Sequence, residues 1–448
     1  VRDGHLHRQR AATGHAGVAH ALAVAVPGVC AGNVGAVGHR LFPLRCAHDT
    51  KRASLHLLAI TIMNKKSTAS ILGQLTAQQF IDTVWQQQPL LVKAALPAVA
   101  GIIDGNDLCG IACEAEGEAR LIITDAQQTD WQCEQGPFKA KRFKTLPPSH
   151  WTLLVQSVDQ WIPEIQALLA QFDFLPRWRL DDIMISYATD GGGVGPHFDY
   201  YDVFLLQAAG KRRWQVGQRC DENSALRDNE KIKLLKDFHT EADYTLATGD
   251  MLYLPAGVAH WGTAVGDDCI TISIGFRAAS HKEIVQAALE NIAETLPGNL
   301  RYRDTTTSID SDPFCINNSA VDNLMAIWKT LSEDDIRTAL AQALGELATE
   351  PRNPDREEPE DTLDEKQLVK KLAAKNGLVV EHHPASRFAY HRLDEENADL
   401  YVDGAMLCTT PALAQAICHG RITAKECSSE YDRELLLALL NQGSLTIV

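Results

Sequence analysis

The chain has 448 residues, of which 45% are hydrophobic and 22% are charged, and its formal charge is −16. These values are typical of a globular protein with two to four domains. No run of 18 uninterrupted apolar residues occurs, which argues against a membrane span. The eleven cysteines are scattered without a Cys-x-x-Cys pair, so they fit reduced thiols better than a disulfide framework or a zinc site. We therefore expect a cytoplasmic protein.

The first 62 residues differ from the rest in composition. They carry seven Lys/Arg, seven of the sixteen histidines and no Glu, and an ordinary texture begins at Met63. We interpret residues 1–62 as a non-native or disordered extension, with Met63 as the natural start; a basic targeting segment is the alternative. The remaining residues carry a formal charge of −21. This acidic excess raises solubility, and it favours a basic partner over direct binding to phosphates.

The segment before residue 177 mixes helices and strands. Thr76 and Gln79 form a capping box that starts a helix carrying Phe80, Val84 and Trp85, and a strand follows over 90–92. We expect a helix over 104–118, paired strands at 121–124 and around Trp131, and a helix that Ser149 caps and that carries Trp151, Leu154, Val155, Val158 and Trp161.

From about residue 177 the pattern becomes that of strands. We expect strands over 182–187 and 202–207, a turn at Gly210-Lys211 into a strand over 212–216, a strand after the Gly249-Asp250 turn, and a closing strand over 270–276. Short strands with tight glycine turns between helical segments predict a small antiparallel barrel in a helical frame.

The pattern is helical again after Arg277. Ser280 and Glu283 form a second capping box, and helices are expected over 320–331 and 334–348. An acidic, proline-rich linker over 351–361 separates them from a terminal α+β module over 362–448. In that module we expect helices over 365–372, 411–418 and 431–441 and strands over 386–390 and 400–402.

Three residues, His197, Asp199 and His260, are the candidate metal ligands and the candidate catalytic centre. Two imidazoles and one carboxylate hold one face of an octahedral ion and leave the other face open, which suits non-haem Fe(II). Residues two apart on a strand point to the same side, so His197 and Asp199 can face one ion. The alternative is that the His-x-Asp spacing is accidental and that His260 is an ordinary core histidine.

The glycines and prolines around these residues have a recognisable spacing. The two segments follow Gly191-x5-His197-x-Asp199-x3-Val203-x6-Gly210 and Gly249-x5-Pro255-x-Gly257-x2-His260. They resemble the two cupin motifs. Cupins often have His where this chain has Asp199, Glu where it has Val203 and Asn where it has Ala264. With Asp199 in place of this His, the site has two His and one carboxylate and resembles that of the JmjC-type oxygenases that depend on 2-oxoglutarate.

That resemblance implies a cation for the distal carboxylate of 2-oxoglutarate. Arg212 is our candidate, because a guanidinium matches a carboxylate with two parallel hydrogen bonds. Its neighbours Lys211 and Arg213 face the other way by alternation. A surface salt bridge is the alternative role for Arg212. Thr271 and Ser273 on the closing strand are further candidates for contacts with the co-substrate, although strand hydroxyls usually serve packing.

Longer motifs make the resemblance more specific, and the chain is similar to the bacterial ribosomal oxygenase family. The motifs are Trp85-Gln-Gln-Gln-Pro-Leu90, Trp151-Thr-Leu-Leu-Val-Gln156, Ile183-Met-Ile-Ser186, Gly-Gly-Gly-Val-Gly-Pro-His197, Tyr201-Asp-Val-Phe204, Lys-Arg-Arg-Trp214 and Ser273-Ile-Gly-Phe-Arg277. The resemblance implies an α+β fold: a double-stranded β-helix (cupin/JmjC) catalytic domain over 63–277, a helical dimerisation region over 278–350 and a winged-helix-like C-terminal module. It further implies a homodimer.

The function that this resemblance implies is Fe(II)- and 2-oxoglutarate-dependent hydroxylation of a basic ribosomal protein, at the β carbon of an arginine of large-subunit protein L sixteen. Oxygen is the second co-substrate. Candidates for the substrate contact are Asp190, Tyr187, Tyr201 and Asp202, which lie close to the first motif, although tyrosines at a barrel rim often only pack. Residues 361–448 are not basic overall, so we expect a protein contact or a structural role there and no binding to nucleic acid.

Two other functions remain open at this point. The first is a 2-oxoglutarate oxygenase that acts on another protein residue or on an N-methyl group. The second is a cupin module that binds a metal without turnover.

Overall fold

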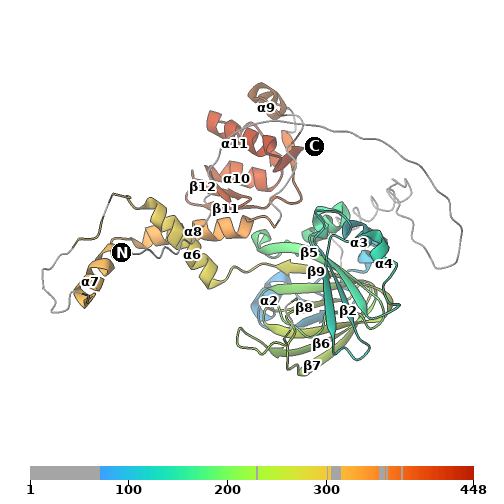
Figure 1. Cartoon of the computed structure of the whole chain (residues 1–448). Helices are drawn as coiled ribbons and strands as arrows, with labels where there is room; N and C mark the ends of the chain where they lie inside the picture. Colours follow the sequence, from blue (N-terminus) through green and yellow to red (C-terminus); the bar gives the residue numbers. More distant parts are fainter. Residues whose placement is uncertain are drawn as a thin grey trace, which may run out of the picture. The chain divides into compact units, whose positions relative to one another are not determined.

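The structure, a computed structural model, describes residues 71–228, 231–299, 301–303, 314–352, 359, 362–374 and 377–448 (Figure 1). The expectations for residues 1–62, and those for most of the linker over 351–361, lie outside these residues. The chain divides into a unit over 1–43 and a unit over 44–448, and all described residues belong to the second. Among them, no helix has both the length and the apolar character that a membrane crossing requires.

The first described elements agree with the predicted capping signals. Thr76 and Gln79 form the capping box of α2 (Ala77–Thr83), and Asp104 and Asp107 form that of α3 (Gly105–Ile111). Helix α3 is shorter than predicted because the chain turns back over its end, where a Cβ on Gly117 would lie 2.0 Å from the Ile111 carbonyl oxygen. Short helical segments follow: η1 (Pro97–Val99), α4 (Ala140–Phe143), η2 (Val158–Gln160), α5 (Pro163–Gln166), η3 (Ala167–Phe172) and η4 (Arg177–Arg179).

One predicted helix is wrong, because the residues after Ser149 form strand β4 (Trp151–Val155). This strand lies between β2 (Ala119–Thr124) and β5 (Leu180–Ala188) and pairs antiparallel with both. Its side chains are buried on both faces, so the alternation that marks a strand is hidden. A short apolar run of this kind does not distinguish a strand from a helix.

The predicted barrel is present as a nine-stranded antiparallel sheet. Its order is β1-β8-β6-β9-β5-β4-β2-β3, with β7 paired to β6. Strands β6 and β9 pair along most of their length, and the sheet curls around them (Figure 1). The remaining strands are β1 (Leu90–Val92), β3 (Trp131–Gln135), β6 (Asp202–Arg219), β7 (Thr240–Ala247), β8 (Met251–Leu254) and β9 (Val258–Phe276).

The predicted turn at Gly210-Lys211 is also wrong, because β6 continues through it. Gly210 has φ +64, and the register with β9 steps from Gln207↔Thr271 to Ala209↔Ile270 and then to Lys211↔Val265. In the first step two residues of β6 oppose one of β9, which is a β-bulge, and in the second step two residues of β6 oppose five of β9. A bulge reverses the alternation of faces, so Gln207 and Arg212, five residues apart, both point into the barrel.

A large apolar core lies between the outer face of the barrel and the helices before it. Its aromatic centre includes Phe80, Phe172, Phe204 and Phe276, each at most 1% exposed. The rings of Phe80 and Phe204 are 5.8 Å apart, so α2 packs directly on β6. This packing holds the strands that carry the site in a fixed arrangement.

Three helices follow the barrel. Ser280 and Glu283 form the predicted capping box of α6 (His281–Thr295), which packs on α8 (Glu333–Thr349) through Ala288, Ile292, Ala339 and Ala343. Between them in the sequence lies α7 (Asn318–Trp328), which contains no buried residue.

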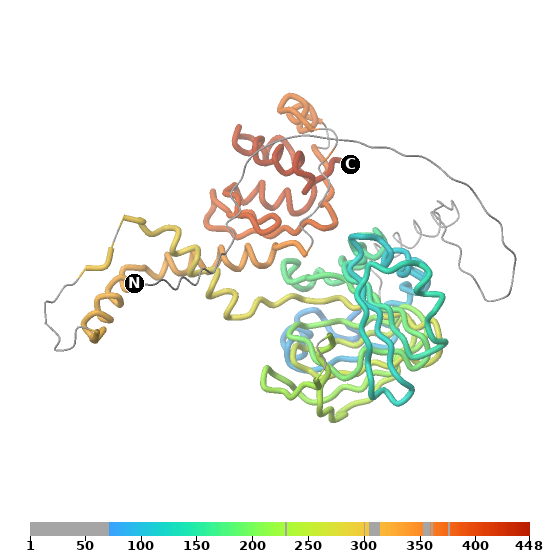
Figure 2. Tube along the Cα trace, viewed as in Figure 1, coloured from blue at the N-terminus to red at the C-terminus, as the bar shows by residue number. Residues whose placement is uncertain are grey.

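The last residues form the predicted α+β module, with a core of its own around Leu368, Leu400, Leu413 and Leu436 (Figure 2). Helices α9 (Glu365–Leu372) and α10 (Pro411–Cys418) have the predicted bounds, and α11 covers Glu430–Asn441. Two three-stranded sheets are built from β10 (Leu378–His382), β14 (Arg421–Ile422) and β15 (Leu445–Ile447), and from β11 (Phe388–Arg392), β12 (Ala398–Val402) and β13 (Ala405–Thr409).

Asp181 at the start of β5 binds two arginines from these later segments. Arg352, after α8, donates to its Oδ2 at 2.8 Å, and Arg387, before β11, donates to its Oδ1 at 2.9 Å. Both Asp181 and Arg387 are largely buried. The two arginines lower the pKa of Asp181 although its burial acts in the opposite direction.

Candidate metal and co-substrate site

The three predicted ligands converge. His197 and His260 form an isolated antiparallel bridge, in which each backbone N–H donates to the carbonyl of the other at 3.1 and 2.8 Å. The backbone oxygen of Asp199 accepts from Gly257, which fixes the other end of the same segment. One ligand atom from each of His197, Asp199 and His260 lies within 4.8 Å of the other two. His260 Nε2 and Asp199 Oδ2 are 3.6 Å apart.

Both imidazoles are oriented for binding a metal through Nε2. The Nδ1 of His197 donates to the Gly195 carbonyl at 2.9 Å, and the Nδ1 of His260 donates to the Val258 carbonyl at 3.0 Å. A carbonyl on one ring nitrogen fixes the tautomer that leaves the other nitrogen as the ligand. Burial, with a smaller contribution from His197, lowers the pKa of His260 to about 4, so its ring is neutral at pH 7.

The donor set fits a divalent metal with an open side. Among the residues that the structure describes, no fourth His, Cys, Asp or Glu completes the group. An octahedral ion bound here therefore keeps three positions for other ligands, which is the requirement of a non-haem Fe(II) oxygenase. A zinc site of the structural kind would have a fourth protein ligand.

Arg212 lies inside the barrel and not in a surface salt bridge. Its side chain is 2% exposed, and no carboxylate of the described residues pairs with it. Its Nη1 donates to Ser186 Oγ at 3.2 Å and its Nη2 to the Gly262 carbonyl at 3.3 Å, but its Nε has no partner. Burial lowers the pKa of the guanidinium. A buried cation without a counter-ion is unfavourable, so the site is built to accept an anion.

Trp214 and Gly262 shape the space between Arg212 and the metal ligands. The guanidinium lies 5.0 Å from the Trp214 ring centre, and the indole Nε1 is a second buried donor without a partner. A Cβ on Gly262 would lie 2.6 Å from the Trp214 ring and 2.7 Å from Arg212 Nε, so only glycine fits there. Lys211 and Arg213 are exposed, as alternation predicts, and Arg213 pairs with Asp243.

Thr271 and Ser273 share the interior face with Arg212. Thr271 lies opposite both Ser186 and Gln207, and its hydroxyl donates to Gln207 Oε1 at 3.0 Å. Ser273 is 7% exposed and lies opposite Leu205. The sequence analysis missed Ser186 and Gln207. Their positions two residues from Met184 and Leu205 on the interior face were the only signal available for them.

One of the four substrate candidates is buried and the other three are more accessible. Asp202 is fully buried, and its oxygens accept from Tyr253, Gln86 and Arg179, so it is a structural residue. The other three are more accessible: the carboxylate of Asp190 accepts from the Gly266 backbone, Tyr187 packs on Trp151 and donates to Asp268, and Tyr201 is 38% exposed.

Tyr201 is the candidate that adjoins the metal ligands. Burial raises the pKa of its hydroxyl, and the charges of Asp199, Asp182 and Asp181 add to this. Its ring lies 3.7 Å from the position that a Cβ on Gly275 would occupy. The ring therefore covers the end of β9 beside Asp199.

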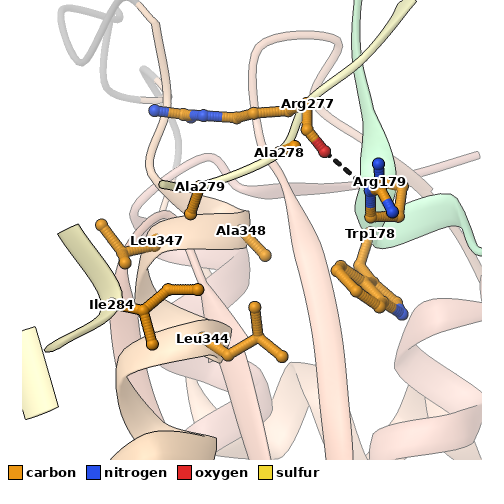
Figure 3. Close-up of a pocket in the computed structure, with 9 residues that line it drawn as sticks. All are labelled: Trp178, Arg179, Arg277, Ala278, Ala279, Ile284, Leu344, Leu347 and Ala348. Carbon is orange, nitrogen blue, oxygen red and sulfur yellow. Dashed lines mark hydrogen bonds between the residues drawn. The ribbon is translucent and has the colours of Figure 1, made fainter. Parts of the chain in front are cut away.

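A separate shallow pocket lies where α6 and α8 meet the segment around η4 (Figure 3). It is mostly apolar, and Arg179 Nε donates to the Arg277 carbonyl at one edge. No candidate site residue lines it. Its lining residues are Trp178, Arg179, Arg277, Ala278, Ala279, Ile284, Leu344, Leu347 and Ala348.

The barrel and its two-His, one-carboxylate centre resemble those of the JmjC oxygenases, and comparison with protein families agrees. The JmjC domain family matches residues 167–284, and the ROXA-like winged helix family matches residues 327–446. The chain therefore has a region similar to the JmjC domain and a later region similar to the ROXA-like winged helix.

Individual proteins similar to this chain point to a narrower group than the domain families do. The chain is 36% identical over 259 residues to a probable ribosomal oxygenase of Haemophilus influenzae, and 35% identical over 225 residues to the ribosomal protein uL16 3-hydroxylase of Escherichia coli. These alignments cover 57% and 50% of this chain, and 63% and 59% of the relatives, which is less than two thirds of their length.

The solved structures extend the similarity over more of the chain. The X-ray structure of E. coli YcfD covers 84% of this chain and 99% of its own, with 28% identity and a TM-score of 0.72. A second structure of YcfD, described as a ribosomal oxygenase in complex with cobalt and 2-oxoglutarate, has a TM-score of 0.70, again with 28% identity, and covers 84% of this chain and 98% of its own.

Proposed function

We propose that this chain is an Fe(II)- and 2-oxoglutarate-dependent protein hydroxylase. The observation that carries the proposal is the buried guanidinium of Arg212, whose Nε has no hydrogen-bond partner, in the same barrel as the three converging metal ligands. A binding module that held only a metal would have no use for a second, cationic site. A cupin without turnover is therefore the weaker explanation.

The spacing of the two sites supports 2-oxoglutarate as the co-substrate. His260 lies opposite Val216 and Arg212 lies opposite Ala264, a separation of four residues or about 13 Å of strand. The guanidinium reaches back to Gly262, only two residues or about 7 Å from His260. A five-carbon diacid with C–C bonds of about 1.5 Å spans a gap of this order.

The residues of the chain have distinct roles in this proposal. His197, Asp199 and His260 hold the ion on one side, and Arg212 binds the distal carboxylate with charge-assisted hydrogen bonds. Bound iron supplies the activation of oxygen that couples decarboxylation of 2-oxoglutarate to hydroxylation of the substrate. Thr271 and Ser273 line the interior face and exclude water from it.

The proposed substrate is an arginine of ribosomal protein uL16, oxidised at the β carbon. The support for it is the similarity to the uL16 3-hydroxylase of E. coli. A basic substrate also complements the acidic charge of residues 63–448. Tyr201, half-exposed beside Asp199, is the residue we propose to contact it. A ribosomal substrate would place the protein in the cytoplasm.

The test is turnover with the proposed substrate. Purified protein with Fe(II), 2-oxoglutarate and recombinant uL16 should yield succinate and a 16 Da mass gain on one arginine. Substitution of Asp199 by Ala should abolish both products, whereas Arg213→Met, at an exposed position next to Arg212, should leave them unchanged. If uL16 gains no mass while another basic protein gains 16 Da and succinate is formed, the oxygenase has a different substrate.

We also propose that the chain forms a homodimer through α6, α7 and α8. Helix α7 exposes Leu324, Met325, Ile327 and Trp328, each at least 47% accessible, and contains no buried residue. Exposed apolar stripes of this size mark interfaces. Light scattering should give twice the mass of the chain, and Leu324→Asp with Trp328→Asp should give the monomer mass.

A further inference from the structure

Gln207 is a fully buried amide in the bulge of β6, and the chemistry proposed above makes no use of it. Its Oε1 accepts from the Thr271 hydroxyl at 3.0 Å. Its Nε2 donates to the Ala209 carbonyl at 2.6 Å and contacts Cys269 Sγ at 3.4 Å. Both ends of the amide are therefore bound to residues of the bulge or of the strand facing it.

The backbone of Gln207 is held from the opposite side. Its N–H donates to the Asp250 carbonyl at 2.9 Å, and its carbonyl accepts from Gly249 at 2.8 Å. The residue thus joins β9, the bulge and the turn before β8. A buried amide with this number of bonds specifies one backbone geometry, because any other arrangement would leave polar groups unpaired inside the protein.

The geometry that it specifies determines which cation points into the barrel. In an undistorted strand, residues an odd number apart face opposite sides, so an inward Gln207 would go with an outward Arg212. The bulge at Ala209 reverses this and turns Arg212 inward. Without it, Lys211 or Arg213 would face the interior.

The amide also leaves the charge of Arg212 free. The guanidinium of Arg212 donates to Ser186 Oγ and also interacts with Cys269, and Cys269 Sγ contacts Gln207 Nε2 at 3.4 Å, so one side chain separates Gln207 from the guanidinium. A carboxylate at position 207 would still accept from Thr271, but it could not donate to the Ala209 carbonyl. It would also place a negative charge near the cation, in an interior where charges interact strongly.

We propose that Gln207 is a positioning residue of the co-substrate site, whose bonds within the bulge hold the guanidinium of Arg212 inside the barrel and whose neutral amide leaves that cation available to an anion. This inference rests on the proposed function for the identity of the anion, 2-oxoglutarate. The placement of Arg212 by Gln207 stands on the geometry alone.

The test compares Gln207→Leu with Gln215→Leu, a matched substitution on the same strand that removes one bond to the exposed Thr240 hydroxyl. Calorimetry on Mn(II)-loaded protein should show 2-oxoglutarate binding at least tenfold weaker in Gln207→Leu and unchanged in Gln215→Leu. The affinity for Mn(II) should stay within twofold in both. A crystal structure of Gln207→Leu should show Arg212 displaced from the interior.

A third variant separates the position of Arg212 from its charge. In Gln207→Glu the new carboxylate should attract the guanidinium and keep it inside the barrel although the bond to the Ala209 carbonyl is lost, and the variant should still bind 2-oxoglutarate at least tenfold more weakly than the wild type. A folded Gln207→Leu variant with Arg212 in its original place and unchanged affinity would overturn the proposal, and so would an equal loss of affinity for Mn(II). Wild-type protein that binds Mn(II) but not 2-oxoglutarate would instead overturn the proposed function, and the position of Arg212 in the crystal would still decide the role of Gln207.

Discussion

Replacing Arg212 by Met should have opposite effects on binding and on stability. The guanidinium is buried beside Trp214 and has no carboxylate partner, so in the free protein it is an uncompensated charge. Met fills a similar volume, keeps the apolar contact with the ring and removes the charge. We therefore expect the unfolding temperature of the metal-free protein to be retained or raised. Each kcal/mol gained in the free energy of unfolding corresponds to a rise of about 2–4 °C.

The loss of co-substrate binding should be large. A guanidinium that pairs with a carboxylate makes two charge-assisted hydrogen bonds, each contributing about 1.5–3 kcal/mol. The sum is about 3–6 kcal/mol, which corresponds to an affinity lower by roughly 10²-fold or more. Calorimetry with 2-oxoglutarate and Mn(II) measures this directly, and differential scanning fluorimetry measures the unfolding temperature.

The exposed neighbour Arg213 provides the control, because Arg213→Met removes a cation of the same strand that pairs with Asp243 at the surface. It should leave the affinity for 2-oxoglutarate within twofold. An Arg212→Met variant that binds 2-oxoglutarate within threefold of the wild type would refute the assignment of the distal carboxylate to this residue. An equal loss of affinity in Arg212→Met and Arg213→Met would show that the net charge of the protein, and not the position of Arg212, causes the effect.

Three further results are expected. Gly262→Ala should weaken 2-oxoglutarate binding at least tenfold in calorimetry, because its Cβ would lie 2.7 Å from Arg212 Nε. Arg387→Ala should lower the free energy of urea unfolding by about 2–3 kcal/mol without changing the affinity for Mn(II), because it leaves the buried Asp181 with one partner fewer. Burial raises the pKa of Asp159 to about 6 from 3.8, so the folded state binds more protons between these values and its stability falls as the pH rises from about 4 to about 6. Asp159→Asn should remove that part of the pH dependence and raise the unfolding free energy at pH 7 by about 2–3 kcal/mol; an unchanged difference between pH 4 and pH 7 would contradict it.

The sequence by itself determined the features that depend on neighbours along the chain. The capping boxes at Thr76 and Ser280 mark the starts of α2 and α6 because the bonds involved span only three residues. The spacing around His197, Asp199 and His260 predicted their convergence, since glycine and proline restrict the backbone on either side of each ligand. The bounds of α9 and α10 were likewise predictable.

Only the tertiary structure decided which residues face one another. Trp151–Val155 became a strand because it lies between two partners distant in sequence, and burial on both faces hides its alternation. Asp202 became a structural residue because Tyr253, Gln86 and Arg179 meet it inside the protein. The bulge near Gly210 reversed the faces of β6, and there Gln207 accepts a hydrogen bond from Thr271, a residue of β9 more than sixty positions away in the sequence. Local patterns carry no information on such contacts, because their free energy arises only when the strands are already packed together.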